Sequence, residues 1–192
     1  MSIIGLTGPT GAGKSTVSEV ARALGFYVVN CDAVARRVSD EPRVLEALVN
    51  SFGQEIIKNG RLCRQTLARL AFKSEASTAL LNSVLLPPII ERIREEIADK
   101  RNVLLDAPTL FESGADGMCD VTVAVLAARE CLKARIVARD GLTEEDALLR
   151  LSAAKSDEFF KNRCSVIIEN NGSEEELKIK AESILSKYIT EE

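Results

Sequence analysis

Residues 8–15 read Gly-Pro-Thr-Gly-Ala-Gly-Lys-Ser and complete a G-x-x-x-x-G-K-[ST] phosphate-binding motif. The glycines of such a loop let successive backbone N–H groups converge on an anion, and the dipole of the following helix favours the negative charge. Lys14 then reaches the outer phosphates, and the hydroxyl of Ser15 can ligate Mg²⁺. The sequence therefore predicts a binding site for a nucleoside triphosphate.

The segments on either side of this motif have the required character. Residues 2–7 are a short, mostly apolar run typical of a buried strand, and Gly25 follows an amphipathic helix predicted from Lys14 onward. Its apolar positions, at helical spacing, are Val17, Val20, Ala21 and Leu24. A strand, a glycine loop and a helix in this order favour a phosphate site over a chance glycine-rich turn.

Three acidic residues could share the chemistry of such a site. Asp32 follows a β-rich run over 26–30 and could orient or deprotonate an acceptor hydroxyl, or it could simply cap a helix predicted over 33–38. Asp106 ends an apolar strand over 102–106, a pattern that holds Mg²⁺ through water in many phosphate-loop proteins, although acids often end strands for structural reasons. Glu112 could take part in this chemistry, or it could equally be a structural cap.

Three arginines flank a predicted loop over 140–143 between two helices, namely Arg135, Arg139 and Arg150. A helical hairpin of this kind could close over the nucleotide and bring a guanidinium group to its phosphates. The alternative is that these arginines are exposed and solvated, as most helical arginines are.

Composition limits the possible classes of protein. The chain has 192 residues, of which 46% are hydrophobic and 28% are charged, and its net charge is −4. These values indicate one globular domain, weigh against nucleic-acid binding, and leave no segment long enough to span a membrane. We therefore expect a cytoplasmic protein with no obligate protein partner.

The chain has no histidine and five cysteines. A structural zinc site has almost no ligand set, and buried reduced thiols are the expected state of the cysteines. Any proton transfer must fall to a carboxylate, a lysine, a tyrosine or a cysteine.

The order of elements predicts an α/β fold. Short apolar strands over 2–7, 26–30, 102–106, 120–126 and 166–168 alternate with helices, which indicates a parallel sheet of about five strands covered on both faces. A helical insertion lies between the second and third strands, and its last two helices are predicted over 76–86 and 88–99. Asn59-Gly60 marks a turn, and Thr143 and Ser173 mark helix starts. Ligands bind such sheets beyond the carboxyl ends of the strands, where Gly8, Asp32 and Asp106 fall.

Together these motifs resemble the dephospho-CoA kinase family over nearly the whole chain. The matching segments are residues 4–8 with 11–16, residues 32–36 (Asp-Ala-Val-Ala-Arg), 59–64 (Asn-Gly-Arg-Leu-Cys-Arg) with Leu67, 81–82 with 86–90, 107–112 (Ala-Pro-Thr-Leu-Phe-Glu), 138–140 (Ala-Arg-Asp) and 168–172 (Ile-Glu-Asn-Asn-Gly). The chain departs from the family pattern at Pro9-Thr10, Cys63, Pro87 and Thr109, and near Ala154-Lys155 it lacks the family's glutamine.

The resemblance implies a P-loop NTPase-type fold and transfer of the ATP γ-phosphoryl group to the ribose 3′-hydroxyl of dephospho-CoA. It implies a nucleotide-binding core over 1–39 and 102–192, a lid over about 135–163, and an acceptor-binding insertion over 40–101. The catalytic residues would be Asp32 as base, Lys14 and Arg139, and the acceptor contacts would be Thr7, Asp32, Arg64 and Glu112. Mg²⁺ would bind Ser15 and, through water, Asp106. The ATP contacts would be Gly8, Gly11, Ala12, Gly13, Lys14, Ser15, Thr16 and Arg139.

Three other functions remain as alternatives. A kinase for another small acceptor, such as a nucleoside, a nucleotide or a sugar acid, would share the chemistry and differ only in the insertion. A switch or motor ATPase is disfavoured because the N-K-x-D and L-S-G-G-Q motifs are absent. An inactive binding module is disfavoured because Lys14, Ser15, Asp32 and Arg139 are all present.

Overall fold

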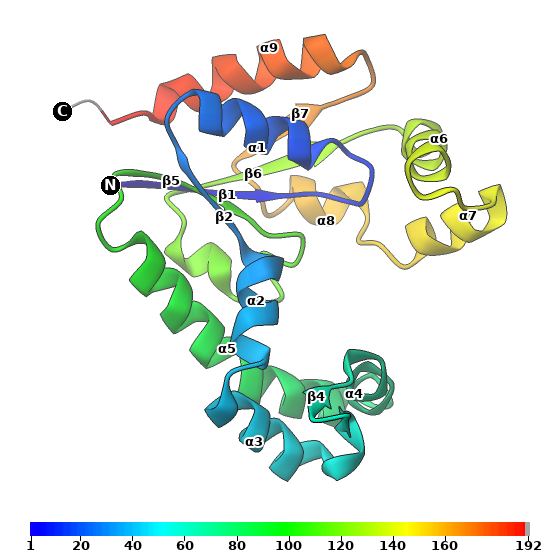
Figure 1. Ribbon diagram of the computed structural model, residues 1–192. Helices are drawn as coiled ribbons and strands as arrows, with labels where there is room; N and C mark the ends of the chain where they lie inside the picture. The colour runs from blue at the N-terminus through cyan, green and yellow to red at the C-terminus, as the bar shows by residue number, and fades with distance from the viewer. Residues whose placement is uncertain (191–192) are drawn as a thin grey trace. The chain divides into compact units, whose positions relative to one another are not determined.

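The computed structural model, which describes residues 1–190, contains a five-stranded parallel sheet in the order β2-β5-β1-β6-β7 (Figure 1). This confirms the predicted α/β class. The strands are β1 (Ser2–Thr7), β2 (Tyr27–Asn30), β5 (Asn102–Asp106), β6 (Val121–Leu126) and β7 (Val166–Glu169).

The strand register aligns several carboxyl ends. Asp106, the last residue of β5, pairs with Leu6 on β1 on one side and with Asn30 on β2 on the other. Thr7 at the end of β1 pairs with Ala124 on β6. Asp106 is therefore fixed at the edge of the sheet from which the phosphate loop departs.

The contacts divide the chain into two units, one formed by Met1–Asn30 with the chain from Asp99 onward, and one formed by Cys31–Ala98. The sheet belongs to the first unit. Its helices are α1 (Lys14–Ala23), α6 (Arg129–Asp140), α7 (Glu144–Ser152), α8 (Asp157–Lys161) and α9 (Glu174–Leu185), with 3₁₀ turns η2 (Ala115–Met118) and η3 (Ser186–Tyr188).

Helices α1 and α9 cover one face of the sheet, and α8 lies on the other (Figure 1). Successive side chains of β6 point to opposite faces of the sheet, as expected for a strand buried on both sides. Val123 and Val125 belong to the large core cluster beneath α1 and α9, whereas Ala124 and Leu126 pack with Phe160 of α8.

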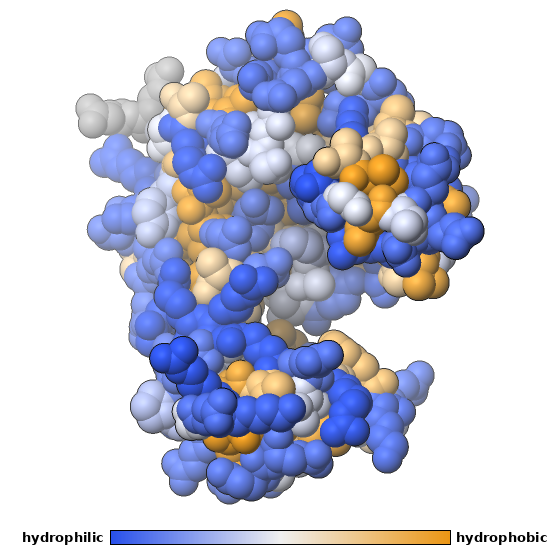
Figure 2. Space-filling view, turned by 45° about the vertical axis from the view of Figure 1, so that its right-hand side comes forward, coloured by the Kyte–Doolittle hydropathy of each residue, from blue (hydrophilic) through white to orange (hydrophobic). Residues whose placement is uncertain are grey.

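The α6–α7 pair continues the larger core. Ile136 on α6 and Ala147 on α7 are fully buried, while Leu149 on the outer side of α7 is 72% exposed. Figure 2 shows apolar side chains emerging among hydrophilic ones in this part of the surface. The inner side of the α6–α7 pair therefore packs against the rest of the first unit.

The predicted helix caps at Thr143 and Ser173 are confirmed. The hydroxyl of Thr143 accepts a hydrogen bond from the backbone N–H of Asp146, and that of Ser173 accepts one from Glu176. Each cap satisfies a backbone donor that the first helical turn leaves without a partner.

The second unit is mainly helical. It contains α2 (Cys31–Ser39), α3 (Pro42–Phe52), α4 (Arg64–Ala71), α5 (Glu75–Ile97), the 3₁₀ turn η1 (Gln54–Ile56) and a hairpin of β3 (Ile57–Lys58) and β4 (Arg61–Leu62). The predicted turn at Asn59-Gly60 closes this hairpin, with φ angles of 51° and 73°. Helix α2 groups with this unit, whereas the resemblance implies that residues 1–39 belong to the nucleotide-binding core.

The prediction of two helices over 76–86 and 88–99 is wrong, because α5 is continuous through Pro87 and Pro88. A proline has no N–H to donate within the helix and usually interrupts it. Here Ile89, Ile93 and Ile97 are buried, and α5 packs against α2, α3 and α4. These tertiary contacts outweigh the local preference. Neither α5 nor any other helix within residues 1–190 is apolar over a sufficient length to cross a bilayer.

Candidate active site

The phosphate loop connects β1 to α1 through three glycines in the left-handed region. Gly8, Gly11 and Gly13 have φ angles of 135°, 80° and 104°. A Cβ atom at Gly8 would collide with the carbonyl oxygen of Val125 on β6, and one at Gly13 would lie 2.6 Å from Nδ2 of Asn170. The loop thus requires glycine at these positions for both conformation and space.

Lys14 and Ser15 occupy the first turn of α1, which contains no acidic residue. The Nζ atom of Lys14 donates to the carbonyl oxygens of Gly8 (2.7 Å) and Pro9 (3.2 Å), so the ammonium group lies across the loop. Ser15 is exposed. A helix N-terminus with these two side chains can hold an anion.

Asp106 is half-buried at the end of β5, and its Oδ2 atom accepts a hydrogen bond from Oγ of Ser18 on α1, at 3.1 Å. This bond ties the carboxylate to the helix that carries Ser15. A hydroxyl and a carboxylate are the oxygen ligands that Mg²⁺ prefers, usually together with phosphate oxygens and water. No group of three or more Cys, Asp or Glu residues that could hold a metal occurs in the described chain, so a protein-only metal site is not formed there.

Arg139 lies at the last turn of α6 and reaches the phosphate loop. Its Nη2 atom donates to Oγ1 of Thr10 at 3.3 Å, and its Nε atom donates to Oδ1 of Asp140 at 2.7 Å. Arg150 on α7 also pairs with Asp140. Hydrogen bonding to Arg139 holds the pKa of Asp140 below its usual value of 3.8, and the same bond raises the pKa of Arg139. Of the three predicted arginines, Arg139 thus donates a hydrogen bond to the loop, and Arg150 contacts Asp140.

Asn170 and Arg135 form a connection that sequence reasoning missed. Nδ2 of Asn170 donates to the carbonyl oxygen of Ala12 in the loop at 2.7 Å, and Asn170 is only 5% exposed. Nη1 of Arg135, which lies on α6, donates to the carbonyl oxygen of Asn170 at 3.0 Å. The sequence signals were the family match of residues 168–172 and the position of Arg135 in the predicted helical hairpin, and neither indicated that the two residues are linked. Beside this connection, a cavity of about 320 Å³ is lined by Gly13, Thr16, Arg135, Asn170, Gly172, Glu174 and Leu177.

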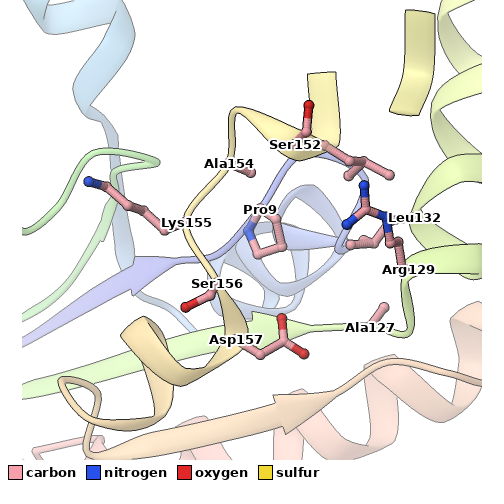
Figure 3. Close-up of a pocket in the computed structure, with 10 residues that line it drawn as sticks. Pro9, Ala127, Arg129, Leu132, Ser152, Ala154, Lys155, Ser156 and Asp157 are labelled. Atoms are coloured by element: carbon pink, nitrogen blue, oxygen red, sulfur yellow. The ribbon is translucent and has the colours of Figure 1, made fainter. Parts of the chain in front are cut away.

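A second cavity, of about 440 Å³, lies on another side of the loop (Figure 3). Its apolar lining comes from Pro9 in the loop, Ala127 after β6, Leu132 on α6, and Leu151 and Ala154 at the end of α7. We call it the Pro9 cavity. Both cavities are of a size that accommodates a small molecule or part of one.

The turn after β5 carries Glu112, which is exposed and lies 3.7 Å from Nζ of Lys155. Thr7 supports this turn, because its hydroxyl donates to the carbonyl oxygen of Pro108 at 3.2 Å. Thr7 has an exposed fraction of 0%. The direct acceptor contact that the resemblance implies for Thr7 does not fit this burial, and Thr7 instead holds the turn in place.

Asp32 and Arg64 belong to the second unit. Asp32 is exposed in the first turn of α2, inside the helix rather than before it, and no side chain within residues 1–190 pairs with its carboxylate. The alternative interpretation of Asp32 as a cap preceding the helix is therefore wrong. Arg64, the first residue of α4, donates from Nη2 to Oδ2 of Asp40 at 2.7 Å and to the carbonyl oxygen of Arg36 at 3.1 Å.

All five cysteines are free, as expected, but only Cys31 is buried. Desolvation raises the pKa of Cys119 to about 12 and that of Cys164 to about 11. Hydrogen bonding from Thr66 lowers the pKa of Cys63, which precedes α4. Cys63 is therefore the thiol most easily ionised among these three.

Comparison with known proteins identifies what the chain is similar to. A family model described as dephospho-CoA kinase matches residues 2–176. The dephospho-CoA kinase of Corynebacterium diphtheriae is 40% identical over 199 residues, which cover 100% of this chain and 99% of that protein.

Solved structures give the same result at the level of the fold. A crystal structure of a Thermus thermophilus protein matches with a TM-score of 0.84 and 34% identity, covering 98% of both chains. The dephospho-CoA kinase of Campylobacter jejuni matches with a TM-score of 0.71 and 24% identity over 96% of both chains. The similarity to all three extends over nearly the full length, including the helical insertion.

Proposed function

The chain belongs to the dephospho-CoA kinase family, and we propose that its phosphate loop, Asp32 and Arg139 divide the work of phosphoryl transfer. The reaction is the ATP-dependent phosphorylation of the ribose 3′-hydroxyl of dephospho-CoA, which yields coenzyme A and ADP in coenzyme A biosynthesis. The observation that best supports these residue roles is the phosphate loop with Arg139 hydrogen-bonded to it through Thr10.

The loop holds the donor. Its backbone N–H groups over 11–16 face the β-phosphate, and the ammonium group of Lys14 exchanges its contacts with the carbonyls of Gly8 and Pro9 for the outer phosphates. The adenine of ATP occupies the cavity beside Thr16, where the planar guanidinium group of Arg135 supplies one wall. Charge neutralisation and alignment are the main requirements of this reaction.

Mg²⁺ fits the residues at the end of β5. The hydroxyl of Ser15 would be one ligand, and Asp106, which Ser18 holds in position, would act through water. A bound Mg²⁺ neutralises charge on the β- and γ-phosphates. The remaining ligands would be phosphate oxygens and water, which agrees with the small number of protein ligands available here.

Asp32 acts on the acceptor. Its exposed carboxylate accepts the proton of the ribose hydroxyl or orients that hydroxyl towards the γ-phosphorus. Arg64 and Glu112 contact the acceptor, and Thr7 acts indirectly by holding the turn that carries Glu112.

Arg139 stabilises the charge that spreads over the transferring group. Because Asp140 keeps the guanidinium group directed along the loop, little reorganisation is needed when the phosphates bind. Closure of α6 and α7 over the nucleotide also excludes water, which would otherwise compete with the substrate hydroxyl.

The activity is tested by following ATP consumption by the purified protein with Mg²⁺ and dephospho-CoA, beside adenosine, AMP and gluconate. We expect ADP release that depends on dephospho-CoA, with coenzyme A as the product. Turnover with only another acceptor would place the protein among kinases of different specificity. ATP hydrolysis that needs no acceptor would contradict the kinase assignment.

The role of Asp32 is tested by Asp32→Asn, which keeps the size of the side chain and removes its basicity. We expect kcat to fall by about 100-fold or more, the usual contribution of a general base, with the KM for ATP nearly unchanged. Glu46→Gln, a change of an exposed carboxylate on α3 of the same unit, is the matched control for loss of charge. Unchanged turnover in Asp32→Asn would refute the assignment.

A further inference from the structure

The Pro9 cavity has no role in the mechanism above, and its position restricts what can occupy it. One wall is Pro9, the residue after Gly8 in the phosphate loop, so the cavity opens beside the place where phosphates are held. The loop residues Gly13 and Thr16 line the other cavity, which is assigned to the donor base. The two cavities thus offer separate places on one loop for the two substrates.

The chemistry of the acceptor decides which of its parts lies nearest the loop. In dephospho-CoA the reacting hydroxyl is on the ribose of an adenosine, and the diphosphate and pantetheine arm leaves from the 5′-carbon of that ribose. The 3′-oxygen must reach the γ-phosphorus in line with the bond that breaks. The ribose therefore lies against the loop, and its adenine lies one sugar ring away, within reach of a cavity that the loop itself borders.

The lining of the Pro9 cavity matches a purine. Half of its lining residues are apolar and can contact a flat aromatic ring, and they are Pro9, Ala127, Leu132, Leu151 and Ala154. The other half are polar or charged, and they are Arg129 at the start of α6, Ser152, Lys155, Ser156 and Asp157 at the start of α8. Small-molecule sites combine apolar walls with polar groups that fix the orientation of the ligand.

Asp157 is the acidic residue among those that line the cavity. In Figure 3 its carboxylate is drawn below Pro9 and to the left of Ala127, whereas Nζ of Lys155 points away from these residues. Neither Asp157 nor Arg129 has a hydrogen-bond or ion-pair partner within residues 1–190. A carboxylate accepts from the exocyclic amine of adenine, and a guanidinium group can donate to a ring nitrogen.

We propose that the Pro9 cavity binds the adenine of the acceptor, with Asp157 as the residue that recognises its exocyclic amine. The proposal rests on the function proposed above and extends it, because it assigns a purine-binding site for the acceptor in the first unit. A hypoxanthine base carries a carbonyl oxygen where adenine carries the amine. That oxygen would face the carboxylate of Asp157 and be repelled, so the wild-type protein should prefer the adenine acceptor.

The test compares Asp157→Ala, which has no side-chain acceptor, with the wild-type protein on two acceptors, dephospho-CoA and its deaminated hypoxanthine analogue. We expect the KM for dephospho-CoA to rise by about tenfold, as for loss of one hydrogen bond to a charged group. The KM for the hypoxanthine analogue should not rise, because the change removes the carboxylate that repels its oxygen, and the KM for ATP should stay the same.

Two further variants control this result. Glu158→Gln removes the neighbouring exposed carboxylate of α8, which does not line the cavity, and should change neither KM. Ala154→Phe fills the cavity and should raise the KM for both acceptors without affecting the KM for ATP. This second change tests the location of the base independently of Asp157.

Each other outcome overturns the proposal in a recognisable way. An unchanged KM for dephospho-CoA in both Asp157→Ala and Ala154→Phe means that the cavity is not used by the acceptor. A raised KM for ATP means that it holds the donor base instead, and an equal rise for both acceptors in Asp157→Ala means that Asp157 does not recognise the base. Wild-type protein that fails to phosphorylate dephospho-CoA would refute the proposed function itself.

Discussion

Asn170 shows how one side chain can link separate parts of the site. It is 5% exposed, and its amide donates to the carbonyl oxygen of Ala12 in the phosphate loop. Its backbone carbonyl accepts from Arg135 on α6. The loop after β7 therefore fixes both the phosphate loop and the helix that carries Arg139.

Asn170→Ala removes the donor and leaves the carbonyl oxygen of Ala12 buried without its partner. An unsatisfied buried group costs about 1–3 kcal/mol, so we expect the free energy of unfolding to fall by that amount. ATP binding should weaken as well, because the loop is less well held. Urea denaturation and calorimetric titration with ATP measure the two effects.

The control for this change is Asn171→Ala at the neighbouring position. Oδ1 of Asn171 accepts from the backbone N–H of Ala128 at 2.7 Å, but this bond is exposed and water can replace the lost partner. The loss of stability should therefore be smaller than for Asn170→Ala. An equal or larger loss in Asn171→Ala would contradict the importance given to the buried bond.

At the residue scale, the sequence could predict those site residues that lie next to one another in the chain. The phosphate loop lies within eight successive residues, so its glycines, Lys14 and Ser15 could be assigned directly. The bond from Asn170 to Ala12 joins residues 158 positions apart, and that from Arg139 to Thr10 joins residues 129 apart. No local pattern encodes such pairs, and only the folded chain brings them together.

At the scale of elements, α5 demonstrates that packing can overcome a strong local signal. Pro87 and Pro88 lie within a 23-residue helix. The strands, by contrast, followed their apolar patterns closely, because a short run buried on both faces leaves few other conformations. The prediction of helices failed in α5, where the local tendency of proline to interrupt a helix was opposed by the tertiary packing that favours one.

Pro87→Ala tests how much Pro87 destabilises α5. Pro87 is exposed, so its replacement removes little packing and restores an N–H donor for the helix. A proline inside a helix costs about 3 kcal/mol relative to alanine, and part of this is offset by the stiffer unfolded chain. We expect the variant to be more stable by about 1–2 kcal/mol in urea unfolding. A loss of stability would show that the proline ring makes favourable contacts.

At the scale of the whole molecule, the two units separate the proposed functions of the chain. The phosphate loop, Asp106 and Arg139 lie in the first unit, and Asp32 and Arg64 lie in the second. The sequence predicted a helical insertion, because helices replace strands there. It did not predict that α2 groups with the insertion, since that depends on contacts between α2 and the distant α5.

This division predicts different effects of the two substrates on amide hydrogen exchange. A non-hydrolysable ATP analogue with Mg²⁺ should protect residues 8–16 and α6, because the loop and Arg139 contact its phosphates. Dephospho-CoA should protect α4, which carries Arg64, and the segment over 151–157 beside the Pro9 cavity. At a ligand concentration of 100 times Kd, binding adds about 2.7 kcal/mol, which slows exchange by about 100-fold for amides that open only in the free state.

Helix α3 serves as the internal reference, because no residue of Pro42–Phe52 is assigned a substrate contact. Its exchange should change little with either ligand. If the ATP analogue protected α4 as strongly as the phosphate loop, the assignment of donor contacts to the first unit alone would be wrong. Protection of α4 without protection of 151–157 by dephospho-CoA would confine acceptor binding to the second unit, and the adenine would then have to bind outside the Pro9 cavity.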